Sequence, residues 1–190
     1  KKTLSYILAI VVCLATLCGC GDTPSGGQTT DGPRDSVMLR NALGMQTTDP
    51  ADTNETDVLT VNEQIYEGLY TLDESGGGYQ PCLAKQIDIS DDATVYTITL
   101  QDGVKFHNGE ELKASDVKYT FERMLTVQGG TNSEFLDQIK GSTELFDGTA
   151  TELEGFEILD DYTFKLTLKE PYSGFLACIS TPAVCIYNEK

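Results

Sequence analysis

Regular alternation of apolar and polar residues in two stretches, 93–100 and 162–168, is the sequence feature that most constrains the fold. Successive side chains of a β-strand point to opposite faces, so such alternation is typical of a strand with one buried face. The apolar side of the two stretches consists of Tyr96, Ile98, Leu100, Phe164, Leu166 and Leu168. The sequence therefore predicts two half-buried strands whose apolar faces contribute to a core.

Turn residues beside both stretches predict antiparallel hairpins. After the first stretch, Asp102-Gly103 is expected to turn the chain into a short strand, Val104–Phe106, which Asn108-Gly109 closes. An Asn-Gly dipeptide readily adopts the positive φ that tight hairpin turns require. Before the second stretch, Asp160-Asp161 is expected to connect it to a partner strand at Glu157–Leu159.

Helical periodicity predicts further elements on both sides of these hairpins. The segments Asn54–Tyr70 and Ser115–Val127 place apolar residues three or four positions apart, as amphipathic helices do. We also expect a short helix at Ser133–Ile139, and a core helix that turns into a strand at Pro182 within Phe175–Ile186. Elements in this order indicate an α/β chain with an α+β subdomain. The predicted buried set of that subdomain is Tyr96, Ile98, Leu100, Phe106, Phe121, Met124, Phe164 and Leu166.

The charge of the chain and its shortage of catalytic groups argue against several function classes. The chain has 13 Lys and Arg against 30 Asp and Glu, a formal charge of −17. Such a surface repels the phosphate backbone, which argues against nucleic-acid binding. A hydrolase needs a nucleophile, a base and an orienting group, and the single histidine, His107, lies in a predicted turn without a recognisable partner. We expect no enzyme activity, no cofactor and no metal site.

The first 20 residues have the pattern of a secretory signal. Lys1-Lys2 precedes an apolar stretch, Tyr6–Leu17, and the signal ends in Leu17-Cys18-Gly19-Cys20. This ending resembles the bacterial lipobox, whose final cysteine receives a diacylglyceryl group before cleavage. The resemblance implies that residues 1–19 are removed and that Cys20 carries the lipid, which holds the protein on the outer, periplasmic face of the cytoplasmic membrane. Cleavage elsewhere by an ordinary signal peptidase and retention as a membrane-spanning anchor are the alternatives.

Residues 20–35, which follow the predicted cleavage point, have the composition of a linker. They are rich in Gly, Ser, Thr, Pro and Asp, so a flexible tether is expected there. A short buried strand, Ser36–Arg40, is predicted to follow the tether.

Three cysteines remain beyond the tether, Cys82, Cys178 and Cys185, so at most one disulfide can form among them. Cys178 and Cys185 lie in an apolar run, and we interpret them as buried thiols.

Seven motifs occur in an order and spacing that match a known family. They are Asp49-Pro50, Ile65–Leu69, Pro81–Ala84, Tyr96–Gly109, Ala114–Val117, Asp160–Leu168 and Pro171-Tyr172. Together they resemble the bacterial extracellular solute-binding proteins of family 5, the dipeptide- and oligopeptide-binding lipoproteins of ABC importers. The resemblance covers residues 37–188. It departs at Ile87 and Ile98, where the family has aromatic residues, and both positions stay apolar.

The resemblance implies a type II periplasmic-binding-protein-like fold, of which this sequence covers the first lobe only. Residues 36–72 are expected to start that lobe, residues 73–185 to form its inserted subdomain, and residues 186–190 to begin the return to the lobe. The hinge and the second lobe are expected to lie outside this sequence. The function implied is the binding of peptides for import by the permease and ATPase subunits of an ABC transporter. Binding of nickel chelates, sugars or haem on the same fold, or a surface interaction role without transport, are the alternatives.

The resemblance also suggests where a ligand lies. In the family the segment after Asp-Pro borders the ligand, which here corresponds to Asp52, Thr53, Asn54, Glu55 and Thr56. A carboxylate in this segment is suited to hold the amino terminus of a peptide. The competing interpretation is that Thr53 or Asn54 caps the predicted helix and that Glu55 and Asp57 favour its positive end.

Overall fold

A computed structural model describes residues 47–73, 75–127 and 130–189 of the chain. These residues belong to one compact unit, Asn41–Lys190. The predicted signal, lipidation site at Cys20, tether and strand at 36–40 lie outside the described residues. Within the described ranges, no helix is long and apolar enough to cross a bilayer.

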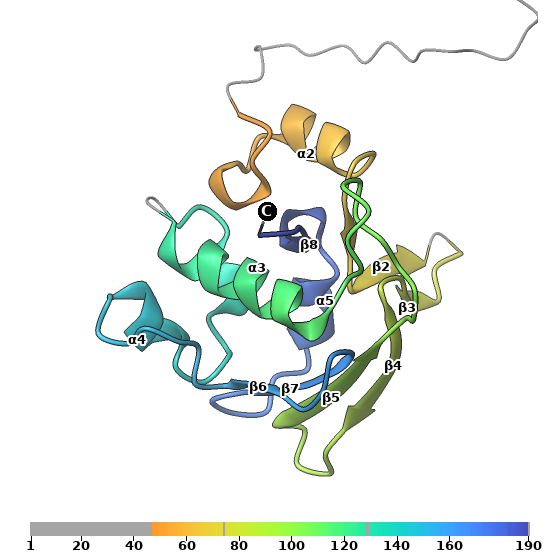
Figure 1. The fold of residues 1–190 in the computed structure, drawn as a ribbon. Helices are drawn as coiled ribbons and strands as arrows, with labels where there is room; N and C mark the ends of the chain where they lie inside the picture. The colour runs from red at the N-terminus through yellow and green to blue at the C-terminus, as the bar shows by residue number, and fades with distance from the viewer. Residues whose placement is uncertain (1–46, 74, 128–129, 190) are drawn as a thin grey trace, which may run out of the picture. The chain divides into compact units, whose positions relative to one another are not determined.

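The described residues form short helices, 3-10 turns and three small sheets (Figure 1). In chain order the elements are η1 (Pro50–Asp52), α2 (Thr56–Asn62), β1 (Glu67–Gly68), β2 (Tyr70–Asp73), β3 (Gly78–Pro81), β4 (Ala84–Ile89), β5 (Val95–Leu100), α3 (Ala114–Thr126), η2 (Ser133–Leu136), α4 (Ser142–Phe146), β6 (Phe156–Ile158), β7 (Thr163–Thr167), α5 (Phe175–Ile179), η3 (Pro182–Val184) and β8 (Cys185–Ile186).

The largest sheet has four antiparallel strands in the order β4-β5-β7-β6. The two predicted alternating strands are therefore confirmed, and they pair directly, with Ile98 opposite Phe164. Their apolar sides are buried as expected, since Tyr96, Ile98, Leu100, Phe164, Leu166 and Leu168 are each at most 4% exposed. The hairpin of β6 and β7 around Asp160-Asp161 is also confirmed.

The predicted pairing of Val104–Phe106 with the first strand is wrong. β5 pairs instead with β4, an edge strand that the sequence patterns did not predict. Lys105 forms an isolated bridge with Glu111, and Phe106 N–H donates to the Glu110 carbonyl at 2.9 Å. The Asn108-Gly109 turn thus closes a small loop on itself. The predicted core residue Phe106 is only half-buried as a result.

Helix α3 provides the apolar face that covers the sheet, as its periodicity predicted. Phe121 and Met124 are at most 1% exposed. Phe121 contacts Phe156 edge to face, with ring centroids 5.9 Å apart, and Phe156 stacks on Phe164 at 4.8 Å. These three rings join the helix to β6 and β7 in a continuous core.

The helix predicted at Asn54–Tyr70 is wrong in its second half. α2 ends at Asn62, and the chain then forms β1 and β2. Gly68 pairs with Cys185 of β8, and its carbonyl accepts from Leu83 N–H at 3.1 Å. Backbone pairing with segments far along the chain thus replaces the helix. The apolar spacing of this region is misleading, because Ile65 is 42% exposed.

Smaller elements agree with the sequence in part. The helix expected at Ser133–Ile139 is the short 3-10 turn η2, and α4 was not anticipated. The helix followed by a strand is confirmed by α5 and β8, but Pro182 begins the 3-10 turn η3 and the strand starts only at Cys185. Cys82, Cys178 and Cys185 are free thiols, of which Cys185 is buried and Cys178 is half-buried.

Candidate functional site

The predicted ligand-bordering segment begins in a 3-10 turn that Asp49 caps. The Asp49 carboxylate accepts a hydrogen bond from Ala51 N–H at 3.1 Å. Pro50 follows at the first position of the turn, where its fixed φ and missing N–H are compatible with a helical start. The dipeptide Asp49-Pro50 therefore determines locally how the segment begins.

Arg123, on α3, fastens this capped turn to the core. Its guanidinium contacts both carboxylate oxygens of Asp49, with Nη1 2.8 Å from Oδ1 and Nη2 bonded to Oδ2. The hydrogen bonds from Arg123 lower the pKa of the Asp49 carboxyl below its usual value of 3.8. The same bonds raise the pKa of Arg123. The pair is thus charged at neutral pH and has the two-point geometry that favours Arg over Lys.

Asn132 supplies a second, independent attachment. Its side chain is 2% exposed, and its Nδ2 donates to the Pro50 carbonyl at 3.0 Å and to the Thr53 carbonyl at 2.8 Å. One amide group therefore satisfies two backbone acceptors of the segment.

The residues around the Thr53 attachment form a strip, Asp52–Thr56, most of which is exposed. The side chains of Asp52, Asn54, Glu55 and Thr56 are exposed. Thr53 is 4% exposed, and its hydroxyl accepts from Glu55 N–H at 3.3 Å. The structure thus presents four of the five predicted ligand-bordering residues on the surface and buries the fifth.

The strip is extended at Thr53 and Glu55, whereas Asp52 belongs to η1 and Thr56 begins α2. Thr53 has φ −144° and ψ 140°, and Glu55 has φ −72° and ψ 123°. No hydrogen bond within the described part of the chain uses the N–H or carbonyl of Asn54. The predicted cap by Thr53 or Asn54 is wrong, because the N-cap position of α2 is Glu55 and no side chain caps the helix there. Glu55 and Asp57 do lie at the N-terminal end of α2, as the same interpretation expected.

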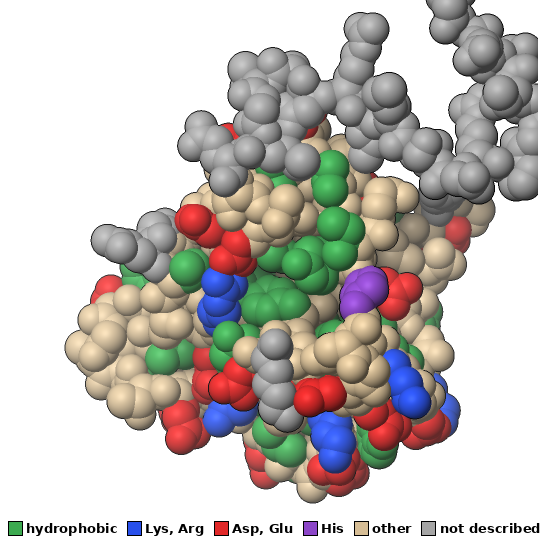
Figure 2. Space-filling model, turned by 45° about the horizontal axis from the view of Figure 1, so that its top comes forward, with side chains coloured by type: hydrophobic (Ala, Val, Ile, Leu, Met, Phe, Trp, Pro, Cys, Tyr) green, Lys and Arg blue, Asp and Glu red, His purple; other side chains and the backbone are tan. Residues whose placement is uncertain are grey.

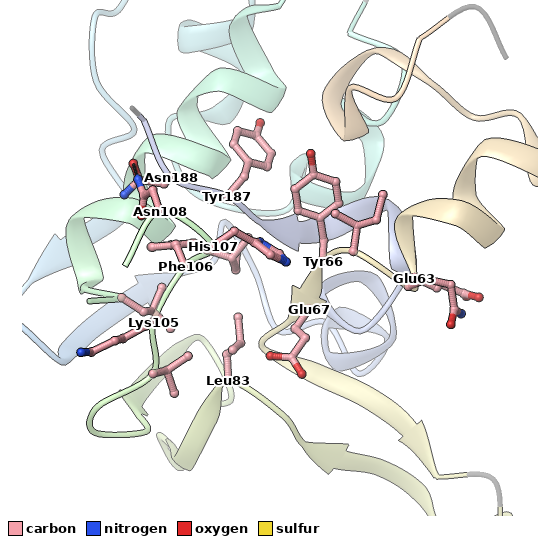
Figure 3. Close-up of a pocket in the computed structure, with 15 residues that line it drawn as sticks. Glu63, Tyr66, Glu67, Leu83, Lys105, Phe106, His107, Asn108, Tyr187 and Asn188 are labelled. Carbon is pink, nitrogen blue, oxygen red and sulfur yellow. Dashed lines mark hydrogen bonds between the residues drawn. The ribbon is translucent and has the colours of Figure 1, made fainter. Parts of the chain in front are cut away.

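A hollow of about 540 Å³ opens next to these elements and was not predicted from the sequence. Its walls are the connection from α2 to the first residue of β1 (63–67), the turn at 104–108 and the chain at 186–188, with Leu83 and Leu112 also lining it. Figure 2 shows apolar side chains gathered in a depression beside His107, the purple side chain. In Figure 3, the His107 ring points toward Tyr66, whereas the Lys105 ammonium points away from the hollow.

Tyr187 lines the hollow and also contacts Arg123, the residue that holds Asp49. Its ring lies edge to face with Tyr66, with centroids 6.5 Å apart. The Arg123 guanidinium carbon lies 5.3 Å from the centroid of the Tyr187 ring, and Arg123 Nη1 donates to Tyr187 Oη at 3.2 Å. Burial raises the pKa of Tyr187 to about 12, so the phenol remains a neutral partner. Arg123 thus contacts both the strip's anchor, Asp49, and a wall of the hollow.

The periodicity of α3 gave no signal for this role of Arg123. On the helix pattern it belongs to the polar face with Lys118 and Glu122, where a solvated side chain is the usual expectation. The described residues bring no three His, Cys, Asp or Glu side chains together as a possible metal site. What the arrangement offers chemically is an extended, partly unpaired backbone with carboxylates on either side.

Comparisons with known proteins agree on one family. Residues 78–189 match the Bacterial extracellular solute-binding proteins, family 5 Middle. The Glutathione-binding protein GsiB of Salmonella typhimurium is 32% identical over 154 residues, which cover 81% of this chain and 27% of that protein. GsiB of Escherichia coli strain K12 is 31% identical over 152 residues, or 80% of this chain and 27% of the relative.

Solved structures give the same result. Listeria monocytogenes OppA bound to peptide has a TM-score of 0.70 and 32% identity, covering 75% of this chain and 28% of that one. The Escherichia coli murein tripeptide binding protein MppA has a TM-score of 0.69 and 26% identity, again covering 75% of this chain and 28% of that one. The chain therefore spans about a quarter of the length of the relatives that it matches.

Proposed function

Because the chain belongs to family 5 of the bacterial extracellular solute-binding proteins, we propose that it binds peptides for the permease and ATPase subunits of an ABC importer. Its mixed α/β fold covers part of one lobe of a type II periplasmic-binding protein. The relatives support a peptide ligand, since one is named for glutathione, another for a murein tripeptide, and OppA was solved with peptide bound. In this proposal the protein binds and releases its ligand without chemical change.

The observation that carries the proposal is the unpaired backbone of Asn54 in the extended strip. An extended peptide is recognised through main-chain hydrogen bonds when a partner segment offers free N–H and C=O groups. Asn54 offers one of each, and Thr53 and Glu55 on either side hold the backbone in the required conformation. Such recognition is independent of the peptide's sequence, because every peptide carries the same backbone groups.

Asp52 and Glu55 give the strip a negative charge suited to a peptide amino terminus. Both side chains are exposed and no salt bridge among the described residues involves them. A carboxylate that accepts from an ammonium group forms a charge-assisted hydrogen bond, which is stronger than a neutral one. We assign to these two residues the recognition of the free amine.

Domain closure completes the proposed mechanism. Residues 36–72 and 186–190 are assigned to the body of the first lobe and residues 73–185 to its inserted subdomain. The peptide is enclosed when a second lobe, which belongs to the part of the family fold beyond this sequence, closes on the strip. Burial between two lobes then supplies affinity that one exposed strip lacks.

Lipid anchoring at Cys20 is a separate part of the proposal. It is supported by the sequence Leu17-Cys18-Gly19-Cys20, which ends the apolar signal. Mass spectrometry of the native protein is expected to find acyl chains on Cys20, and Cys20→Ala is expected to release the protein from membranes. An unmodified N-terminus beyond residue 20 would contradict the anchor and leave the peptide site untouched.

Calorimetric titration with trialanine, using the protein as its gene encodes it, tests the peptide site. Asn54→Ala keeps the backbone N–H and is expected to bind like the wild type, whereas Asn54→Pro removes the donor and is expected to lose affinity. Circular dichroism of both variants controls for folding. Equal affinity of the two variants would exclude main-chain recognition at Asn54. Binding of a sugar, haem or a nickel chelate in place of trialanine would overturn the choice of ligand.

A second titration tests the amine recognition. The double variant Asp52→Asn/Glu55→Gln is expected to bind trialanine about tenfold more weakly, since a hydrogen bond to a charged group contributes roughly 1.5–3 kcal/mol. Asp91→Asn/Glu170→Gln makes the same change of charge at two exposed residues outside the strip and is expected to bind normally. N-acetylated trialanine should not distinguish the variants, and an equal loss with that peptide would contradict the assignment.

A further inference from the structure

We propose that Arg123 and Asn132 are positioning residues that set the place and conformation of the exposed strip, Asp52–Thr56, and thereby its affinity for peptide. The inference rests on the proposed function of the strip. It concerns two buried or half-buried side chains that do not themselves lie in the strip.

The first reason is that the strip is held by side chains and not by a sheet. Within the described residues, the backbone of Asp49–Asn54 makes no backbone hydrogen bond to another helix or strand. Its one internal backbone bond joins Asp52 N–H to the Asp49 carbonyl at 3.1 Å. At its other end the strip continues into α2, where the Glu55 carbonyl accepts from Val58 N–H at 3.0 Å and from Leu59 N–H at 2.9 Å. The position of its first part, Asp52–Asn54, relative to the core therefore depends on the side chains that reach it from elsewhere.

The second reason is that the two residues hold different backbone and side-chain groups of the segment. Arg123 holds the Asp49 carboxylate, which in turn accepts from Ala51 N–H, so the start of the segment is fixed. Asn132 holds the carbonyls of Pro50 and Thr53, so the end of the turn is fixed as well. The Arg123 contact lies before Asp52 and the two Asn132 contacts lie on either side of it, so the loss of either residue loosens the chain that enters the strip.

The third reason is that both positioning residues are themselves held. Arg123 lies on α3, where Tyr187 also contacts its guanidinium. Asn132 immediately precedes η2 and is 2% exposed. A binding group must be held close to its productive geometry by neighbours whose own conformations are locked, and these two side chains meet that requirement.

A purely structural role makes a different prediction from a positioning role. If the contacts serve only the stability of the fold, their loss lowers the stability of the whole unit and leaves the strip no more mobile than the sheet. If they position the strip, the amides of Ala51, Asp52 and Glu55, which are hydrogen-bonded within the segment, exchange faster while those of β5 and β7 do not.

Hydrogen exchange followed by mass spectrometry separates the two cases. The test variants are Asp49→Asn, which removes the charge that Arg123 holds, and Asn132→Leu, which removes the amide donor at similar size and adds no charge beside the two carbonyls. The control is Asp161→Asn, which makes the same atomic change in another ion pair of this unit, with Lys113 at 2.6 Å. We expect about tenfold faster exchange in residues 50–56 in both test variants, as a loss of roughly 1.4 kcal/mol in local stability implies.

Trialanine affinity, measured on the same proteins, completes the experiment. Both test variants are expected to bind trialanine about tenfold more weakly than the wild type, while the amides of β5 and β7 exchange at the wild-type rate. Asp161→Asn is expected to equal the wild type in both affinity and exchange. Exchange in residues 50–56 that equals the control, or that rises equally throughout the unit, overturns the positioning role. If the wild type binds no trialanine, the proposed function fails, and the exchange result still decides whether Arg123 and Asn132 position the strip.

Discussion

The hydroxyl of Thr120 bonds both backbone groups of Tyr187, donating to its carbonyl at 3.2 Å and accepting from its N–H at 3.3 Å. Thr120 is fully buried on α3, and Tyr187 directly follows β8. We expect Thr120→Val to lower the free energy of unfolding by about 2 kcal/mol, because a side chain of the same shape leaves both groups without this partner. Urea unfolding followed by circular dichroism measures the change.

Thr126→Val on the same helix serves as the control for that substitution. Thr126 is exposed, and its hydroxyl donates to the Glu122 carbonyl at 2.8 Å. Its replacement is expected to change stability by no more than about 0.5 kcal/mol. Equal effects at the two threonines would show that the link between α3 and β8 contributes little.

Phe121→Ala is expected to destabilise the protein by about 3–5 kcal/mol, since it opens a cavity in the core between α3 and the sheet. Phe121 has no exposed surface and contacts the Phe156 ring. Phe146→Ala removes the same atoms at a site that is 52% exposed and is expected to have a much smaller effect. Thermal unfolding of the two variants compares them, and similar shifts in Tm would contradict the placement of Phe121 in the core.

The ion pair of Asp49 and Arg123 makes stability depend on pH in the acid range. Because hydrogen bonds from Arg123 lower the pKa of Asp49, the folded protein keeps this carboxylate charged where the unfolded chain takes up a proton. The contribution of the ion pair to the free energy of unfolding is complete above the usual pKa of 3.8 and is lost as the pH falls through the lowered pKa of Asp49. The free energies of unfolding of the wild type and Asp49→Asn are therefore expected to differ at neutral pH and to converge below about pH 4.

Urea unfolding of these two proteins at a series of pH values measures the convergence. Asp91→Asn, at an exposed turn residue, serves as the control and is expected to follow the wild-type curve throughout. If the difference in free energy of unfolding between the wild type and Asp49→Asn stayed constant down to pH 2, the Asp49 carboxylate could not be the cause of that difference.

Cys185 is expected to resist alkylation until the protein unfolds. It is 3% exposed, and burial raises the pKa of its thiol to about 12, so almost no thiolate forms at pH 8. Cys82 and Cys178 are only half-buried and are expected to react first with iodoacetamide. Peptide mapping by mass spectrometry, with and without urea, gives the order of labelling, and fast labelling of Cys185 in the native protein would contradict its burial.

Several elements were predictable because their signal lies within a few neighbouring residues. The alternation around Ile98 and Phe164 predicted β5 and β7, and the spacing of Phe121 and Met124 predicted α3. The same reasoning was wrong beyond Asn62, where apolar spacing suggested a helix. There the backbone of Gly68 pairs with Cys185, and no local pattern encodes a partner so far along the chain.

In the candidate site, too, only the features with a local sequence signal were predictable. The motif Asp49-Pro50 and the resemblance that it carries indicated the strip, Asp52–Thr56, but not which of its side chains are exposed. Thr53 is buried, and its carbonyl accepts a hydrogen bond from the Asn132 amide, which is distant in sequence. The hollow was not predictable, since its walls come from separate segments that only the fold brings together.

The sequence by itself therefore determined the alternating strands β5 and β7, the amphipathic helix α3 and the family. The tertiary structure alone decided that Arg123 meets Asp49, 74 residues away, and that Asn132 meets Thr53, 79 residues away. The physical reason is that strand and helix periodicity reports how each segment faces a core, which is a local property. Which polar side chains satisfy which distant backbone groups depends on how the segments pack, because a buried carbonyl or carboxylate accepts whatever donor the fold places beside it.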